Sequence, residues 1–247
     1  MNALLLVRAH TKIQFLDLIR WPGYVVPTVV FPAMFYSIFD LPAARMYAND
    51  ADLLALAFIA WAVVGVTLYQ FGVGIAQERG RPWERYVRTL PASVLVRFGA
   101  RIATALLFGV ITAALVALVA RAFTPIDLTL GQWLRVLVYA IAGGVPFVLI
   151  GITIGYWASA RASVPMATAV NLLLAYAGGL WMPPQYLPSF VATISPYLPT
   201  RQFGDLLWSV VGHGNASHAV MGLALYTLIF GFLAALGYRR DERKRYA

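Results

Sequence analysis

The dominant feature of this sequence is a series of long stretches without a charged side chain. Four of them cover residues 21–39, 53–77, 102–120 and 136–160. An α-helix needs about 20 mainly apolar residues to cross the hydrocarbon core of a bilayer, and each stretch provides or approaches that length. Because lipid cannot bond an open backbone, such segments fold as helices. The sequence therefore predicts an all-α integral membrane protein.

A further uncharged stretch, residues 162–200, is long enough for two spans, but prolines crowd its second half. They stand at Pro183, Pro184, Pro188, Pro196 and Pro199. Prolines at this density break a helix whose backbone must be bonded internally. We therefore expect one span at about 164–182, and then short helices or a re-entrant segment at the membrane interface within 183–214. With a last span at about 218–238, the predicted total is six.

The positive charges predict the orientation of these spans. With both termini on one side, fifteen of the 19 lysines and arginines fall on that side. The positive-inside rule then places both termini in the cytoplasm and the chain in the cell membrane as a multi-pass protein. An odd number of spans would put the basic tail, residues 239–247, outside. The whole chain, 1–247, is thus expected to form one membrane domain.

The first 20 residues are expected to form a helix on the cytoplasmic leaflet. Arg8 and Lys12 lie one helical turn apart among apolar residues, a pattern typical of an interfacial helix. The apolar run at residues 4–7 is too short for the core of a secretory signal, so no cleavable signal peptide is expected.

Several kinds of active site are missing from the sequence. It has no cysteine, and neither of its two lysines follows a glycine-rich loop, so this chain is not expected to hold ATP itself. The three histidines make no metal motif, and no catalytic residue is assigned. The net charge of +9 would suit a nucleic-acid partner only if it lay on one water-facing surface. It lies instead at the ends of apolar runs, which argues against nucleic acid.

The loop between the second and third expected spans, residues 78–92, combines basic and aromatic side chains. Pro82 at a first-turn position and Pro91 at the end favour a short helix. Trp83 and Tyr86 are three apart and share a face of it. The loop is either a solvated connector whose arginines enforce topology or a docking helix, since aromatic and arginine side chains anchor protein interfaces.

The segment after the fifth expected span also carries a distinctive pattern. The pair Gly178-Gly179 is followed by Trp181 and by clustered prolines. Such a run ends a helix and turns the chain back along the membrane surface, although an ordinary capped loop has similar composition. Earlier in the chain, Gly151 and Gly155 form a small-xxx-small pair that suits close helix packing, either within the chain or between subunits.

In order along the chain, these segments resemble the type-2 ABC exporter permeases, membrane subunits that pair with a separate ATPase. The matching features are a basic N-terminal helix, a first span with prolines, an E-R-G…T-L-P loop, a Gly-Trp-Pro-Pro…Leu-Pro outer element and a last span with a basic tail. One departure is the run from Gly80 to Trp83, where the family often has a sequence such as G-T-L-E.

The resemblance implies roles for two groups of residues. The residues expected to couple the chain to the ATPase are Glu78, Arg79, Gly80, Arg81, Trp83, Glu84, Arg85 and Arg88. The residues expected to form an extracytoplasmic gate are Gly179, Trp181, Met182, Pro183, Pro184, Leu187 and Pro188. The implied partners are two copies of an ABC ATPase, a second permease that is identical or a paralogue, and membrane lipids. ATP and magnesium would be held by the ATPase, with no cofactor on this chain.

The apolar lining of the spans favours export of a hydrophobic or amphipathic compound, such as a drug, lipid or glycolipid. Tyr36, Asn171 and Tyr176 are candidates for the substrate pathway, and Asn171 could equally bond a neighbouring helix. The spans contain no carboxylate or histidine at mid-depth, which argues against an ion-coupled carrier. Two other interpretations remain: a membrane-embedded enzyme that processes lipids, and a scramblase or channel that works without ATP.

Overall fold

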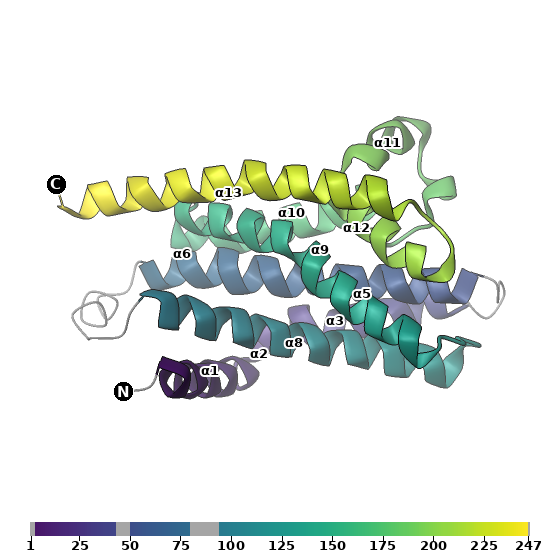
Figure 1. Ribbon diagram of the computed structural model, residues 1–247, viewed down its shortest axis with the longest axis horizontal. Coiled ribbons are helices and arrows are strands. Elements are labelled where there is room, and N and C mark those ends of the chain that lie inside the picture. Colours follow the sequence, from purple (N-terminus) through teal and green to yellow (C-terminus); the bar gives the residue numbers. More distant parts are fainter. Residues whose placement is uncertain (1–2, 43–49, 80–93, 247) are drawn as a thin grey trace.

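A computed structural model describes residues 3–42, 50–79 and 94–246, and every regular element in these ranges is a helix. The elements are α1 (Ala3–Ile19), α2 (Pro22–Val25), η1 (Val26–Val30), α3 (Phe31–Phe35), η2 (Tyr36–Asp40), α5 (Ala51–Thr67), η4 (Leu68–Val73), α6 (Gly74–Arg79), α8 (Val94–Phe123), α9 (Leu130–Trp157), α10 (Ala160–Ala177), η5 (Pro184–Tyr186), α11 (Ser189–Ile194), η6 (Ser195–Tyr197), α12 (Pro199–Trp208), η7 (Ser209–Val211) and α13 (Ala216–Tyr246). The long helices run lengthwise side by side, and both chain ends lie at one end of the bundle (Figure 1). We call this the termini end and the opposite one the distal end.

Five helical segments among the described residues are long and apolar enough to cross a membrane. They are Pro22–Phe39, Ala51–Arg79, Phe98–Phe123, Leu130–Trp157 and Ala216–Arg243. These correspond to the first four expected spans and the last one, so the all-helical membrane class is confirmed. The expected fifth span corresponds to α10, which has 18 residues and is not among the five.

Helix α10 nevertheless lies lengthwise against the second span, in the opposite direction. The hydroxyl groups of Tyr69 and Thr168 are 2.6 Å apart, and the Asn171 side chain, one turn further along α10, lies beside Gly65 on α5. The helix begins at Ala160 because Ser159 caps it, and it ends at Ala177, five residues before the expected boundary. Similarly, α9 begins at Leu130 rather than residue 136, because Thr129 and Gln132 form a capping box.

The prolines of the first span are accommodated by alternating α and π turns. Pro27 stands in the first turn of η1 and Pro32 in the first turn of α3. A proline within a helix removes one backbone donor and clashes with the carbonyl four residues earlier. A π turn closes on the fifth residue instead, as where the Phe31 amide bonds the Val26 carbonyl. The expected helix therefore continues to residue 40 despite its three prolines.

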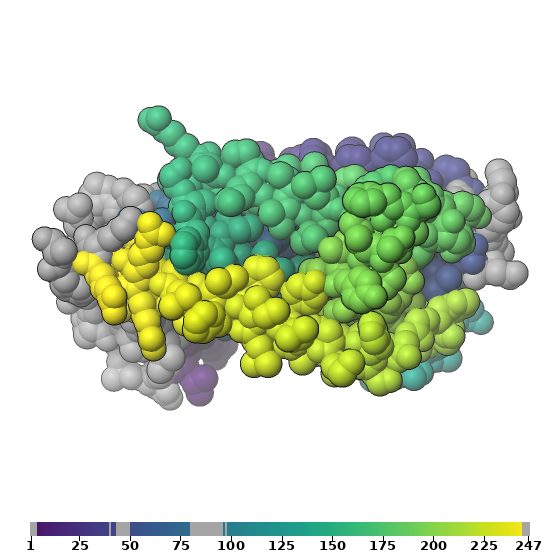
Figure 2. Space-filling model, turned by 90° about the horizontal axis from the view of Figure 1, so that it is seen from above, coloured from purple at the N-terminus to yellow at the C-terminus, as the bar shows by residue number. Residues whose placement is uncertain are grey.

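The second span is the centre of the bundle, and the last span lies on its outside. In their most apolar stretches, 89% of residues are buried in the second span and 17% in the last. Figure 2 shows α13 exposed along its length on one face. Its outward side chains include Met221, Leu228 and Phe232, which suit contact with lipid chains.

The short helices expected within 183–214 are present at the distal end, where α11 stands out to one side of the long helices (Figure 1). Helix α12 does not lie on the surface. Phe203, Leu206, Leu207 and Trp208 are all buried, and α12 packs between α5, α9 and α13. Helix α12 is therefore part of the core of the bundle.

Close packing of α9 on the second span depends on Gly151 and Gly155. A Cβ atom on Gly155 would lie 2.8 Å from both the Ile75 Cβ and the Phe71 carbonyl oxygen. A Cβ atom on Gly151 would lie 3.0 Å from Phe71 Cβ. Two backbones can approach this closely only where a side chain is missing. The pair therefore serves packing within the chain.

We expect Gly155→Ala to lower the free energy of unfolding by about 1–3 kcal/mol, because the added methyl overpacks the contact with Ile75. The measurement is the midpoint of thermal unfolding of the purified chain in detergent. The control is Gly109→Ala, where an added Cβ meets no atom within 4 Å. Alanine favours helix over glycine, so this control should be neutral or stabilising. Equal destabilisation by both changes would contradict the packing argument.

Candidate functional site

At the termini end, Arg79 joins the second span to two other helices. Its Nη1 atom donates to the Tyr156 carbonyl oxygen at 2.7 Å and to Asp241 Oδ1 at 2.9 Å, and Nη2 donates to the Ala158 carbonyl oxygen at 3.1 Å. The two carbonyls belong to the end of α9, where a helix leaves its last oxygens without intrahelical donors. Asp241 belongs to α13. One guanidinium thus ties α6, α9 and α13 together.

The preceding residue, Glu78, binds on the other side, to Arg101 of α8. This ion pair joins the ends of the second and third spans. Arg101 is buried, with 7% of its surface exposed, and its Nη1 atom also donates to the Gln70 carbonyl oxygen at 3.2 Å. Gln70 lies in the π segment η4, whose wider turn alters the regular pattern of helix bonds. Arg101 therefore supplies a hydrogen-bond donor to a carbonyl oxygen of the π segment.

Two adjacent residues of opposite charge thus hold different neighbours at the end of the second span. Glu78 and Arg79 were predicted as coupling residues, and the structure places them directly before residues 80–93. The other predicted coupling residues lie outside the described residues: Gly80, Arg81, Trp83, Glu84, Arg85 and Arg88. Whether any of the eight contacts an ATPase stays a prediction.

Sequence reasoning missed the partners of this pair, Arg101 and Asp241. Neither had been given a partner from the sequence, in which Arg101 directly precedes the third expected span and Asp241 falls in the basic tail. A signal was present, because Glu78 and Arg101 are opposite charges at the ends of consecutive spans that share a loop. Asp241 carries no comparable signal, since it lies 162 residues from Arg79.

At the distal end, the glycine pair after α10 makes the expected turn. The Leu180 amide bonds the Ala175 carbonyl and the Gly179 amide bonds the Tyr176 carbonyl, which is the pattern of a Schellman cap. Gly179 has a φ of 76°, a conformation that favours glycine. The Thr200 hydroxyl donates to the Leu174 carbonyl at 2.6 Å and fastens the cap to α12.

Trp181, a predicted gate residue, packs into an aromatic cluster instead of projecting from the molecule. Its ring is stacked on Phe35 of the first span, with centroids 6.2 Å apart, and meets Trp61 of the second span edge-on at 5.1 Å. Aromatic pairs of this geometry contribute beyond the area they bury. The cluster holds the start of the distal segment against the first two spans.

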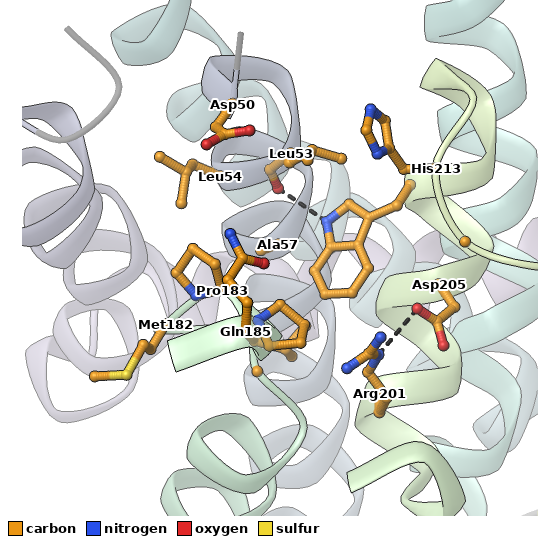
Figure 3. Close-up of a pocket in the computed structure, with 15 residues that line it drawn as sticks. Asp50, Leu53, Leu54, Ala57, Met182, Pro183, Gln185, Arg201, Asp205 and His213 are labelled. Carbon is orange, nitrogen blue, oxygen red and sulfur yellow. Dashed lines mark hydrogen bonds and ion pairs between the residues drawn. The ribbon is translucent and has the colours of Figure 1, made fainter. Parts of the chain in front are cut away.

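Four predicted gate residues line a cavity of about 200 Å³ at the distal end: Gly179, Met182, Pro183 and Pro184. Figure 3 shows Met182 and Pro183 on one side of it, with Arg201 and Asp205 on another. Arg201 Nε lies 2.9 Å from Asp205 Oδ1. The Trp208 indole donates to the Leu53 carbonyl oxygen at 2.9 Å and ties α12 to the start of α5. The cavity is thus framed by α5, α12 and the predicted gate segment.

The remaining gate predictions, Leu187 and Pro188, do not line this cavity. Leu187 is buried and Pro188 is exposed, and both connect η5 to α11. The structure therefore brings together the first part of the predicted gate at the cavity and places Leu187 and Pro188 away from it.

The three predicted pathway residues lie apart. Tyr36 is fully buried and packs edge-on against Phe58, with ring centroids 5.6 Å apart. Asn171 is buried between α10 and α5, and its Oδ1 atom has no hydrogen-bond donor within the described part of the chain. Tyr176 is exposed on α10. A role for any of them in a pathway stays a prediction.

The described residues contain no group of three or more histidine, aspartate or glutamate side chains placed to hold a metal ion. The two ends of the bundle therefore differ: ion pairs connect neighbouring helices at the termini end, and a cavity lies at the distal end.

Comparison with known proteins identifies a family of transporters. A family model described as ABC-2 family transporter protein matches residues 28–237. The "Putative transport permease YvfS" of Bacillus subtilis (strain 168) is 24% identical over 226 residues, which cover 89% of this chain and 91% of that protein. No solved structure matches the chain.

Proposed function

Because the chain belongs to the ABC-2 family of transporter proteins, we propose that it is the membrane permease of an ATP-driven exporter. A separate ATPase, in two copies, would supply the energy, with ATP and magnesium held there. A second permease, identical or a paralogue, would complete the pathway. The cargo would be a hydrophobic or amphipathic compound taken from the cytoplasm or the inner leaflet of the cell membrane.

The observation that carries this proposal is the paired contact of Glu78 and Arg79. A motor that pushes on residues 80–93 needs a rigid connection from that loop to several spans at once. Glu78 links the loop to α8 through Arg101, and Arg79 links it to α9 and α13. Each link combines an ion pair with hydrogen bonds from the same guanidinium to backbone carbonyls, so it fixes the helix ends that it joins. A displacement of the loop would therefore reach three neighbouring helices.

The proposal includes six crossings with both termini in the cytoplasm. Helix α10 would be the fifth crossing, which its lengthwise contact with the second span supports. Its polar Ser163 and Asn171 are buried inside the bundle, where they do not face lipid. The termini end would then be cytoplasmic, α1 would rest against the cytoplasmic leaflet, and the distal cavity would open outside.

The test is to purify the tagged chain gently from its native membrane and to identify its companions. We expect a nucleotide-binding ATPase at a stoichiometric level, and its loss from a variant with Arg81, Trp83 and Arg85 changed to alanine. The control changes Leu130, Arg135 and Tyr186 to alanine, all exposed at the distal end. The control should keep the ATPase.

A well-folded chain that never carries an ATPase would overturn the proposal. Lipid flux through the reconstituted chain alone, indifferent to ATP, would indicate a scramblase or channel. Chemical turnover of a lipid by the chain alone would indicate an enzyme.

A further inference from the structure

A second cavity of about 200 Å³ lies at the termini end, apart from the one in Figure 3. It lies where the end of α1, the start of the first span and the end of the second span meet α8. Its lining includes Asp17, Trp21, Tyr24, Tyr69, Glu78 and Arg101. Two of its lining residues, Trp21 and Val164, are exposed, so the cavity is open to the outside of the bundle beside them. In a membrane this opening would face the region of the lipid headgroups.

The lining carries a net negative charge. Arg101 is already committed to the Glu78 carboxylate and to the Gln70 carbonyl oxygen. Asp17 has no ion pair with any described residue. Asp17 is exposed on α1, and no described cation neutralises its carboxylate, so the lining favours a cation over an anion.

The aromatic rings and one hydroxyl group of the lining indicate which kind of cation the cavity would bind. Trp21, Tyr24 and Tyr69 are among the lining residues, and aromatic rings attract organic cations. Tyr24 is 4% exposed, and its hydroxyl has no hydrogen-bond partner among the described residues. Buried hydroxyls almost always have a partner, so this one is available to a polar group bound in the cavity. An ammonium N–H can donate to the Tyr24 oxygen while its charge is balanced by Asp17.

We propose that this cavity binds the ammonium head of an amphipathic amine, with its apolar tail leaving past Trp21 and Val164 into the lipid. This deepens the proposed function, because it names the chemical class of the exporter's cargo and the point where the cargo enters. The same head group occurs on free alkylamines and on aminophospholipids. Both would present a primary ammonium to Tyr24 and Asp17.

The test measures equilibrium binding of decylammonium to the full chain in maltoside micelles, with decyl sulfate and decanol as matched anionic and neutral probes. We expect decylammonium to bind more tightly than either. Tyr24→Phe and Asp17→Asn should each weaken its binding about tenfold, because the first removes a hydrogen bond to the ammonium and the second removes the charge that balances it. The phenylalanine keeps the ring contact with Phe108, whose centroid is 5.0 Å away.

The controls are Tyr197→Phe and Asp127→Asn, which change exposed residues far from this cavity. They should bind decylammonium as the unchanged chain does. Displacement by phosphatidylethanolamine, but not by phosphatidylglycerol, would identify a lipid head as the source. Resistance to both lipids would indicate a free amine.

Binding of decyl sulfate as tight as that of decylammonium, or unchanged binding in both cavity variants, would overturn the proposal. The assay contains neither ATPase nor ATP. Its failure would therefore leave the exporter proposal standing. Absence of any ATPase from the unchanged chain in the earlier test would leave this proposal to be judged by binding alone.

Discussion

Replacing Arg79 by lysine is expected to lower the free energy of unfolding by about 2 kcal/mol and, in the exporter proposed above, to abolish most coupled transport, although the charge is kept. Arg79 bonds three acceptors on two helices through one planar group. An ammonium group is a point charge and cannot reproduce this fork. At least one carbonyl at the end of α9 would lose its donor. The measurements are the thermal unfolding midpoint and substrate-stimulated ATP hydrolysis by the reconstituted complex.

Arg243→Lys is the matched control, since Arg243 is exposed on the same helix, α13, as Asp241. It should change neither measurement. If Arg79→Lys keeps both stability and coupling, a positive charge is sufficient at this position. The three hydrogen bonds of the guanidinium would then have no role in coupling the loop to α9 and α13.

The second large effect is expected from Glu78→Leu, which should be more damaging than the double change Glu78→Leu with Arg101→Met. The single change leaves the buried Arg101 guanidinium without its carboxylate, and breaking a buried pair from one side costs about 3 kcal/mol or more. Glu78 itself is half exposed, with 46% of its side chain accessible, so losing Arg101 alone should cost less. The double change removes both charges and restores an apolar contact.

A double-mutant cycle on unfolding midpoints measures this coupling between the two residues. The expected order, from most to least stable, is the unchanged chain, the double variant and then Glu78→Leu. If the double variant is no more stable than Glu78→Leu, Arg101 is not held by Glu78, and the link between the second and third spans lies elsewhere.

These two tests address opposite sides of one short segment. Arg79 reports on the connection to α9 and α13, and Glu78 reports on the connection to α8. If the loop at 80–93 transmits motion, each single variant should reduce coupling while ATPase binding persists. Loss of ATPase binding in either one would mean that the joint also shapes the docking surface.

The sequence predicted the membrane class and most of the spans because the requirement is local. A bilayer demands some 20 apolar residues in a row, whatever their neighbours, and the stretches at 53–77 and 102–120 satisfy it alone. The helix end at Gly178-Gly179 was equally readable, since a positive φ is a property of one residue. The position of Glu78 at the end of the second span was also predicted, because the uncharged stretch 53–77 ends directly before it.

What only the tertiary structure decided is which helix ends meet. Span boundaries from charge shifted by several residues, because the caps at Thr129 and Ser159 extend helices past the apolar runs. The contacts of Arg79 with Asp241 and of Glu78 with Arg101, and the place of Tyr24 in the cavity at the termini end, depend on how the spans pack. Apolar side chains are interchangeable against lipid, so a hydropathy pattern specifies that a helix crosses but not which neighbour it contacts. Those contacts arise from close approach at residues such as Gly155 and from charges brought together across the chain.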